Sequence, residues 1–144
     1  MFSSMTKEEI LNFFKDTYYQ VKSFSLNDII ALEGEECVAI GIILSGSVDV
    51  KRMLSNKIIQ MTSFGPGHLF GEVIIFSDVN KYPATVISSS KSEVLFISRE
   101  NFKQFTYTHP DFLEMFLRDL SNKILTLNKS IERLSYNIYI LGRF

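Results

Sequence analysis

Short apolar segments recur along most of the chain at intervals of about eight to twelve residues, which is typical of proteins built from many short strands. Clusters of glycine, asparagine, aspartate, serine and proline separate these segments. In one of them, apolar Val48 and Val50 alternate with polar Asp49 and Lys51, the period of a half-buried strand. The pattern favours a sandwich, roll or jelly-roll barrel over βαβ units. The strands that it predicts are Gln20–Phe24, Asp28–Glu33, Val38–Leu44, Ser47–Met53, Lys57–Ser63, Thr85–Ser89 and Val94–Ile97.

Two local signals refine this pattern near the N-terminus and in the middle of the chain. Thr6, followed by Glu9 three residues later, has the spacing of a capping box, and it predicts a short amphipathic helix over Lys7–Lys15. Ser55-Asn56, between two of the strand segments, predicts the turn of a β-hairpin.

The last third of the chain changes to the longer period of helices. Ser98 can cap a short helix that carries Phe102. Thr108, with Pro110 inside the first turn, then opens a second helix. This helix meets neither glycine nor proline before Gly142, so it can extend for about thirty residues.

The long helix carries apolar residues at alternating steps of four and three residues, which is a heptad repeat. A stripe that packs on its own domain would follow a period of 3.6 residues, and a strict heptad favours a coiled coil instead. Isoleucine at most a positions with leucine at d positions favours a parallel dimer. We therefore expect a homodimer, with packing of the helix on its own domain as the alternative. The expected interface comprises Leu113, Leu117, Leu120, Ile124, Leu127, Ile131, Leu134, Ile138 and Leu141.

Composition and charge narrow the class of protein. The chain has 144 residues, of which 46% are hydrophobic, so it can form a core and is not generally disordered. Its net charge of −1 does not indicate a strongly basic nucleic-acid surface. The single cysteine, Cys37, excludes an internal disulfide and a cysteine-ligated metal cluster. The chain shows neither a membrane-spanning segment nor a signal peptide, so we expect a cytoplasmic protein with no membrane partner.

The densest motif is the glycine-rich segment Phe64–Glu72, which is followed by Ala84-Thr85-Val86. Pro66-Gly67 forms a tight turn, and Gly71 allows a ligand or another chain to approach the backbone closely. A short loop of free N–H groups can hold an anion. The carboxylate of Glu72 can accept hydrogen bonds from a ligand hydroxyl.

This chain contains few of the residues that commonly support catalysis in enzymes. His68 and His109 are the two histidines, and Glu72 beside His68 provides at most two metal ligands where three are usual. Ser88-Ser89-Ser90 lacks the glycine pattern of a nucleophile elbow and a histidine nearby. We therefore expect no enzymatic activity, no catalytic residue and no metal site.

The order of the motifs resembles the cyclic-nucleotide-binding domain of the Crp/Fnr transcription regulators. The motifs that carry the resemblance are Gly34, Leu44–Val48, Phe64–Gly67, Phe70–Glu72, Ala84–Val86 and Glu93–Leu95. The resemblance covers about residues 8–144. It implies a mainly β fold with helices, namely a double-stranded β-helix, or cupin-like jelly-roll β-roll, followed by a long C-terminal dimerisation helix. We expect the β-roll with flanking short helices at 1–108 and the dimerisation helix at 109–141. Residues 142–144 would form a hinge into a helix-turn-helix domain that this chain lacks.

Two positions depart from the family pattern. In members that bind cyclic AMP, an Arg-Ser pair directly before Ala84 grips the phosphate, and this chain has Tyr82 and Pro83 there. A neutral phenol cannot replace a guanidinium, and proline offers neither a hydroxyl nor an N–H group. Loss of such a charge-assisted contact costs about 1.5–3 kcal/mol. The neighbouring Lys81 would point to the opposite side of an extended segment.

The resemblance implies an effector-sensing and dimerisation domain of a transcription regulator, and the departures imply that it does not respond to cyclic AMP. The candidate effector site comprises Phe70, Gly71, Glu72, Val73, Tyr82, Pro83, Ala84, Thr85 and Thr126. We expect no cofactor, and the small-molecule effector is unidentified. The expected partners are a second copy and, through the helix-turn-helix domain, DNA. The alternative is a stand-alone dimeric module that binds a protein partner and has a vestigial pocket.

Overall fold

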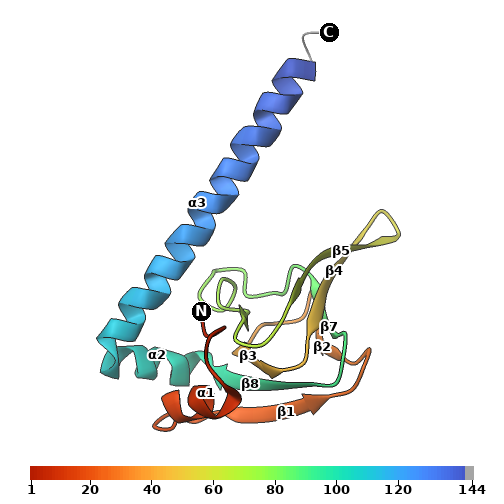
Figure 1. Cartoon of the computed structure of the whole chain (residues 1–144). Coiled ribbons are helices and arrows are strands. Elements are labelled where there is room, and N and C mark those ends of the chain that lie inside the picture. The colour runs from red at the N-terminus through yellow and green to blue at the C-terminus, as the bar shows by residue number, and fades with distance from the viewer. Residues whose placement is uncertain (142–144) are drawn as a thin grey trace. The chain divides into compact units, whose positions relative to one another are not determined.

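The computed structural model describes the backbone of residues 1–141 and the side chains up to Tyr136. The chain divides into two compact units, Met1–Thr108 and His109–Phe144. In the first unit, eight strands form two four-stranded antiparallel sheets (Figure 1). One sheet has the order β1 (Gln20–Phe24), β8 (Ser92–Ser98), β3 (Ala39–Ser45) and β6 (Leu69–Phe70). The other has the order β2 (Ile29–Ala31), β7 (Thr85–Ser88), β4 (Val48–Leu54) and β5 (Lys57–Phe64). The mainly β jelly-roll fold expected from the sequence is confirmed.

The inner faces of the two sheets enclose one apolar core. Ile43 on β3 pairs with Val94 on β8, and both side chains are fully buried. Val48 on β4 and Val86 on β7 belong to the same cluster from the second sheet. Along β4, apolar Val48 and Val50 alternate with polar residues, whereas β3 is buried on both faces and is apolar on both sides of Ile43. The core therefore lies between the sheets and extends as far as Phe70 on β6.

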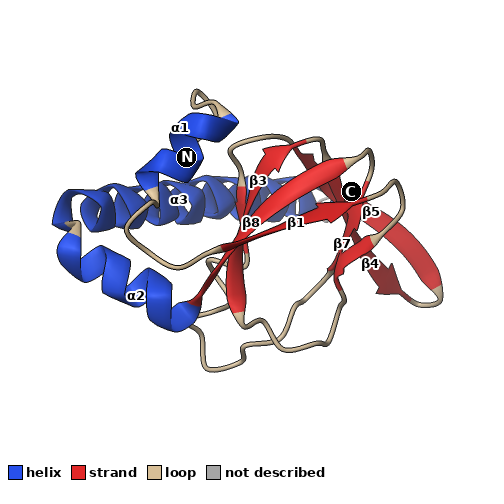
Figure 2. Cartoon of the chain, turned by 90° about the horizontal axis from the view of Figure 1, so that it is seen from below, coloured by secondary structure: helices blue, strands red, loops and turns tan. Residues whose placement is uncertain are grey.

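The outer face of the β1-β8-β3-β6 sheet is apolar as well, because two helices cover it. Helix α1 (Lys7–Phe13) contacts β3, and helix α2 (Arg99–Thr108) contacts both β3 and β8 (Figure 2). Aromatic rings join the helices to each other. The ring centroids of Phe14 and Phe105 lie 4.9 Å apart, and those of Phe2 and Phe14 lie 5.6 Å apart. This aromatic layer holds the N-terminal segment against the roll.

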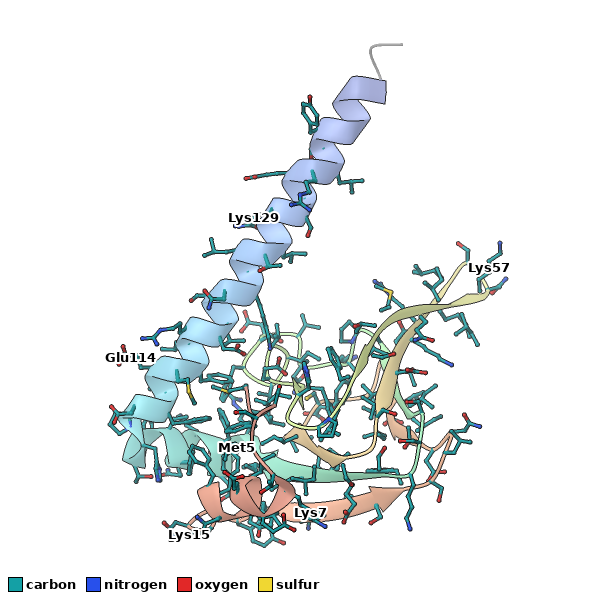
Figure 3. The ribbon with its side chains drawn as sticks, in the orientation of Figure 1. Met5, Lys7, Lys15, Lys57, Glu114 and Lys129 are labelled. Atoms are coloured by element: carbon teal, nitrogen blue, oxygen red, sulfur yellow. The ribbon has the colours of Figure 1, made fainter. Side chains whose placement is uncertain are left out.

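Several local predictions are confirmed. Thr6 and Glu9 form the complete capping box at the start of α1. The hydroxyl of Ser98 accepts a hydrogen bond from the backbone N–H of Asn101, 3.2 Å away, which caps α2. Ser55 and Asn56 have φ angles of 50° and 64°, so the β4–β5 hairpin turns through two left-handed residues, as a type I′ turn does. Figure 3 shows Lys57 at the far end of this hairpin.

Several elements differ from the sequence-based expectation, and the ends of the expected strands shift by at most two residues. Helix α1 ends at Phe13 instead of Lys15, because Phe14 already leaves the helical conformation with φ −98° and ψ 16°. Strand β6 was not expected, since a segment of two residues has no period to detect. Thr108 does not open the long helix. It is the last residue of α2, and its hydroxyl donates to the carbonyl of Phe105, 3.1 Å away.

The second unit contains the long helix α3 (Pro110–Leu141), which has 32 residues. Within the expected heptad stripe, Leu113 and Leu120 are half-buried. Ile138 and Leu141 belong to α3, but their side chains lie outside the described residues, as do the expected hinge residues 142–144. The exposed stripe residues are 53–61% accessible in the single chain: Leu117, Ile124, Leu127, Ile131 and Leu134. In the part of the chain that the structure describes, no helix has the length and apolar character to span a membrane.

Candidate functional site

The connection between β6 and β7 is held in place by backbone pairing with the segment before β3. The N–H of Gly34 donates to the carbonyl of Tyr82 at 2.8 Å, and the N–H of Tyr82 donates to the carbonyl of Glu35 at 3.0 Å. Further along, the N–H of Cys37 donates to the carbonyl of Asn80 at 2.6 Å. This antiparallel pairing positions Tyr82 beside the end of β6.

Gly71 begins the tight turn that follows β6. Its φ is +84°, and its carbonyl accepts the N–H groups of Ile74 at 3.2 Å and Ile75 at 2.9 Å. Those two N–H groups are therefore used inside the turn. A Cβ atom at this position would lie 3.1 Å from the carbonyl oxygen of Ala39 and 3.1 Å from Cys37 Sγ. Both the left-handed backbone and the close packing thus favour glycine.

This turn and the neighbouring strands line an open apolar cavity of about 250 Å³, which we call the loop cavity. Seven of the nine residues predicted to bind an effector line it: Phe70, Gly71, Glu72, Val73, Tyr82, Pro83 and Ala84. Five further residues complete the lining: Val50, Phe64, Leu69, Ile74 and Val86. Sequence reasoning did not select these five. The alternation around Val50 indicated a half-buried strand, and Phe64, Leu69 and Val86 belong to the motifs quoted above, but neither signal could show that these residues face one cavity.

Of the remaining two candidates, one lies in the first unit outside the cavity lining and the other belongs to the second unit. Thr85 does not line it, and its hydroxyl instead accepts the N–H of Glu33 at 3.0 Å. It therefore helps to connect β7 to the segment after β2. Thr126 lies on α3 in the second unit, where its hydroxyl donates to the carbonyl of Asn122 at 2.9 Å. Its part in an effector site stays a prediction.

The described lining of the loop cavity contains no positively charged side chain. Its lining contains two ionisable side chains, Glu72 and Tyr82, and no lysine or arginine of the described residues belongs to it. Glu72 is only 7% exposed. Burial raises the pKa of the Tyr82 phenol well above its usual value, and the hydrogen bond to the Cys37 thiol raises it further. The phenol is therefore neutral at physiological pH, and Lys81, which is exposed, does not line the cavity.

The two histidines belong to different units, since His68 lies in the first unit and His109 begins the second. The ring of His68 stacks on that of Phe64 with centroids 5.2 Å apart, next to the turn that precedes β6. Among the residues that the structure describes, no group of three or more histidine, cysteine, aspartate or glutamate side chains could hold a metal ion.

Two of three comparisons with known proteins find matches for this chain. A family model described as "Cyclic nucleotide-binding domain" matches residues 21–109, which include β2 to β8, all of β1 except Gln20, and the loop cavity. A search of curated protein sequences finds no match.

Among solved structures, a transcriptional regulator from Thermotoga maritima is similar, with 20% identity over 85% of this chain and 94% of that one, and a TM-score of 0.78. The catabolite activator protein of Thermus thermophilus shares 22% identity, with a TM-score of 0.78, over 93% of this chain and 62% of that one. A regulator from Xanthomonas campestris, described as c-di-GMP responsive, shares 19% identity over 87% of this chain and 63% of its own, with a TM-score of 0.70. At these identities the likeness shows a common fold, and this chain spans less than two thirds of the last two proteins.

Proposed function

Because this chain belongs to the cyclic nucleotide-binding domain family, we propose that it is the effector-sensing and dimerisation part of a Crp/Fnr-type transcription regulator. We further propose that its effector is less anionic than a cyclic nucleotide. The observation that carries this second proposal is the lining of the loop cavity, which is apolar and contains no lysine or arginine of the described residues.

The electrostatics of the loop cavity argue against a phosphate. A cyclic nucleotide would bring its negative charge next to the carboxylate of Glu72, with neutral Tyr82 and Pro83 at the positions of the phosphate-gripping pair. Taking a charge out of water is costly unless a partner compensates it. The cavity of about 250 Å³ is also smaller than the pockets of about 300–1,000 Å³ that hold drug-sized ligands. A small, weakly charged effector that stacks on the Tyr82 ring fits both the charge of the lining and the volume of the cavity.

Calorimetric titration with cyclic AMP and cyclic GMP tests the effector proposal. We expect no binding with a dissociation constant below about 10 µM, which corresponds to roughly −7 kcal/mol. Tighter binding would show that another cation compensates the phosphate, and the proposal would then be wrong.

A double variant tests whether Tyr82 and Pro83 are the reason why cyclic AMP binds weakly. Tyr82→Arg with Pro83→Ser restores the guanidinium and the hydroxyl, and it should tighten the binding of cyclic AMP at least tenfold. Tyr107→Arg is the matched control, because it makes the same change of charge at an exposed tyrosine of α2 that does not line the loop cavity. No gain in the double variant, or an equal gain in the control, would contradict the proposed role of these positions.

The proposal of a dimer rests on the heptad of α3. Five of its apolar side chains are more than half exposed in the single chain, which is unfavourable unless another surface covers them. A second copy of the same helix provides a matching apolar stripe, since a parallel two-stranded coiled coil pairs a with a and d with d. In this arrangement the effector would act by favouring one of two dimer geometries, and DNA would be bound through another domain.

A further inference from the structure

A second and larger cavity lies entirely within the first unit. Its volume is about 570 Å³, and it opens between strands β1 and β8 on one side and the segment 30–38 on the other. We call it the strand cavity. Its size falls inside the range of about 300–1,000 Å³ in which pockets hold small molecules. Tyr82 lines both the loop cavity and the strand cavity, so its ring stands between the two spaces.

The strand cavity has an aromatic floor. Phe24 on β1 and Phe96 on β8 meet with ring centroids 6.4 Å apart and planes at 72°, and Tyr82 lines the same space. All three rings also pack against the apolar core between the sheets, which restricts their movement. Fixed aromatic rings favour a ligand with a flat ring, because such pairs gain from edge and face contacts beyond the area that they bury.

Opposite charges border this aromatic floor. The Nζ atom of Lys22 lies 5.4 Å from the centroid of the Phe96 ring, and Glu35 lines the cavity from the segment after β2. Among the described residues, neither Lys22 nor Glu35 takes part in an ion pair. The neighbouring Glu36 differs, since its carboxylate accepts a hydrogen bond from Asn80 at 2.9 Å. Lys22 thus provides one ammonium group to the cavity, and Glu35 and Glu36 provide two carboxylates, of which Glu36 is already bound to Asn80.

We infer that the strand cavity binds a zwitterionic aromatic amino acid. The ring of the ligand lies on Phe24, Phe96 and Tyr82. Its carboxylate accepts hydrogen bonds from Lys22, and its ammonium group donates to Glu35. This site is separate from the loop cavity and does not depend on the effector proposed above. The cavity lining provides a residue for each of these three interactions of the ligand.

The composition of the chain permits a direct test. The protein contains no tryptophan, so the indole fluorescence of added L-tryptophan reports on the ligand alone. We expect a saturable change in emission with a dissociation constant below about 1 mM. Tryptamine, which lacks the carboxylate, and indole-3-propionate, which lacks the ammonium group, should each bind about tenfold more weakly. No saturable change, or equal affinity for all three probes, would overturn the inference.

Two variants test which side chain binds the carboxylate of L-tryptophan and which binds its ammonium group. Lys22→Met should weaken L-tryptophan binding about tenfold and leave tryptamine unaffected, because tryptamine has no carboxylate to lose contact with. Glu35→Gln should weaken L-tryptophan similarly and leave indole-3-propionate unaffected. Lys57→Met, at the remote end of the β4–β5 hairpin, is the control and should bind like the unaltered chain. Circular dichroism of each variant verifies folding, and affinities unchanged in both folded variants would contradict the site.

Discussion

Gly46 and Gly34 share a left-handed backbone conformation but have very different surroundings. Their φ angles are +84° and +87°. A Cβ atom on Gly46 would lie 2.4 Å from the carbonyl oxygen of Lys91 and 2.3 Å from the Ser92 hydroxyl, whereas nothing lies within 4 Å of a Cβ on Gly34. The Ser92 hydroxyl is itself engaged, since it donates to the carbonyl of Ser47 at 3.1 Å. A side chain at Gly46 would therefore disturb the junction of β3–β4 with β7–β8.

Alanine substitution separates the cost of a left-handed backbone from the cost of a steric clash. Gly34→Ala should lower the free energy of unfolding by about 1–2 kcal/mol, the cost of a left-handed backbone for a residue with a Cβ atom. Gly46→Ala should lose about 1–3 kcal/mol more, because backbone atoms must shift to relieve the clash. Urea denaturation measures both values, and equal losses would show that the junction accommodates the methyl group. Gly65→Ala, with open space and no left-handed φ, is the control.

At the scale of elements, one ion pair joins α1 to β8. The Nζ of Lys7 lies 2.8 Å from a carboxylate oxygen of Glu93, and the Ser45 hydroxyl donates to the same oxygen at 3.3 Å. The hydrogen bond to Lys7 lowers the pKa of Glu93 against the opposing effect of desolvation. The same hydrogen bond raises the pKa of Lys7. Both side chains are about one third exposed, so salt screens part of their attraction.

These two pKa directions predict how stability depends on pH. The lowered pKa of Glu93 stabilises the fold above the unfolded value of about 4.3, and this contribution is lost as the pH falls through the folded pKa. The raised pKa of Lys7 stabilises it below the unfolded value of about 10.4, and this contribution is lost as the pH rises through the folded pKa. Lys7→Met should therefore reduce stability at pH 7, with the difference disappearing at strongly acidic pH.

Lys15→Met is the matched control for this measurement, because it removes the same charge from a lysine just beyond α1 (Figure 3). Lys15 has no ion pair among the described residues. Urea midpoints at several pH values compare the two variants. A loss in Lys7→Met that does not change with pH would indicate that packing of the lysine stem, and not the ion pair, connects the two elements.

At the scale of the whole molecule, assembly depends on the apolar stripe of α3. In a parallel dimer, Ile131 at an a position would meet its own copy across the two-fold axis. Ile131→Lys would place two like charges face to face there, an arrangement that costs several kcal/mol. Analytical ultracentrifugation should show a dimer for the unaltered chain and a monomer or an aggregate for the variant. Asn122→Lys adds the same charge at an f position of the heptad and should leave the dimer intact, while a dimeric Ile131→Lys would disprove this interface.

Local structure could be predicted from the sequence, because it depends on interactions between residues that are close together in the chain. The Thr6–Glu9 capping box, the Ser55-Asn56 turn and most of the strands follow from spacing and turn chemistry alone. The glycine-rich motif and the replacement of the Arg-Ser pair by Tyr82-Pro83 likewise pointed to the residues around Gly71, and most of them line the loop cavity.

Only the tertiary structure decided which residues share a space. Strand β6 exists because Gly41 and Ile42 pair with its two residues, and no local pattern marks so short a strand. Phe24, Phe96 and Tyr82 are far apart in the chain, yet sheet pairing and the backbone bonds of the 80–82 segment bring them to one cavity. Alternation along a strand tells which residues share a face, but the partner strands determine what that face meets. The strand cavity and the apolar lining of the loop cavity, which contains no lysine or arginine of the described residues, are therefore products of long-range pairing.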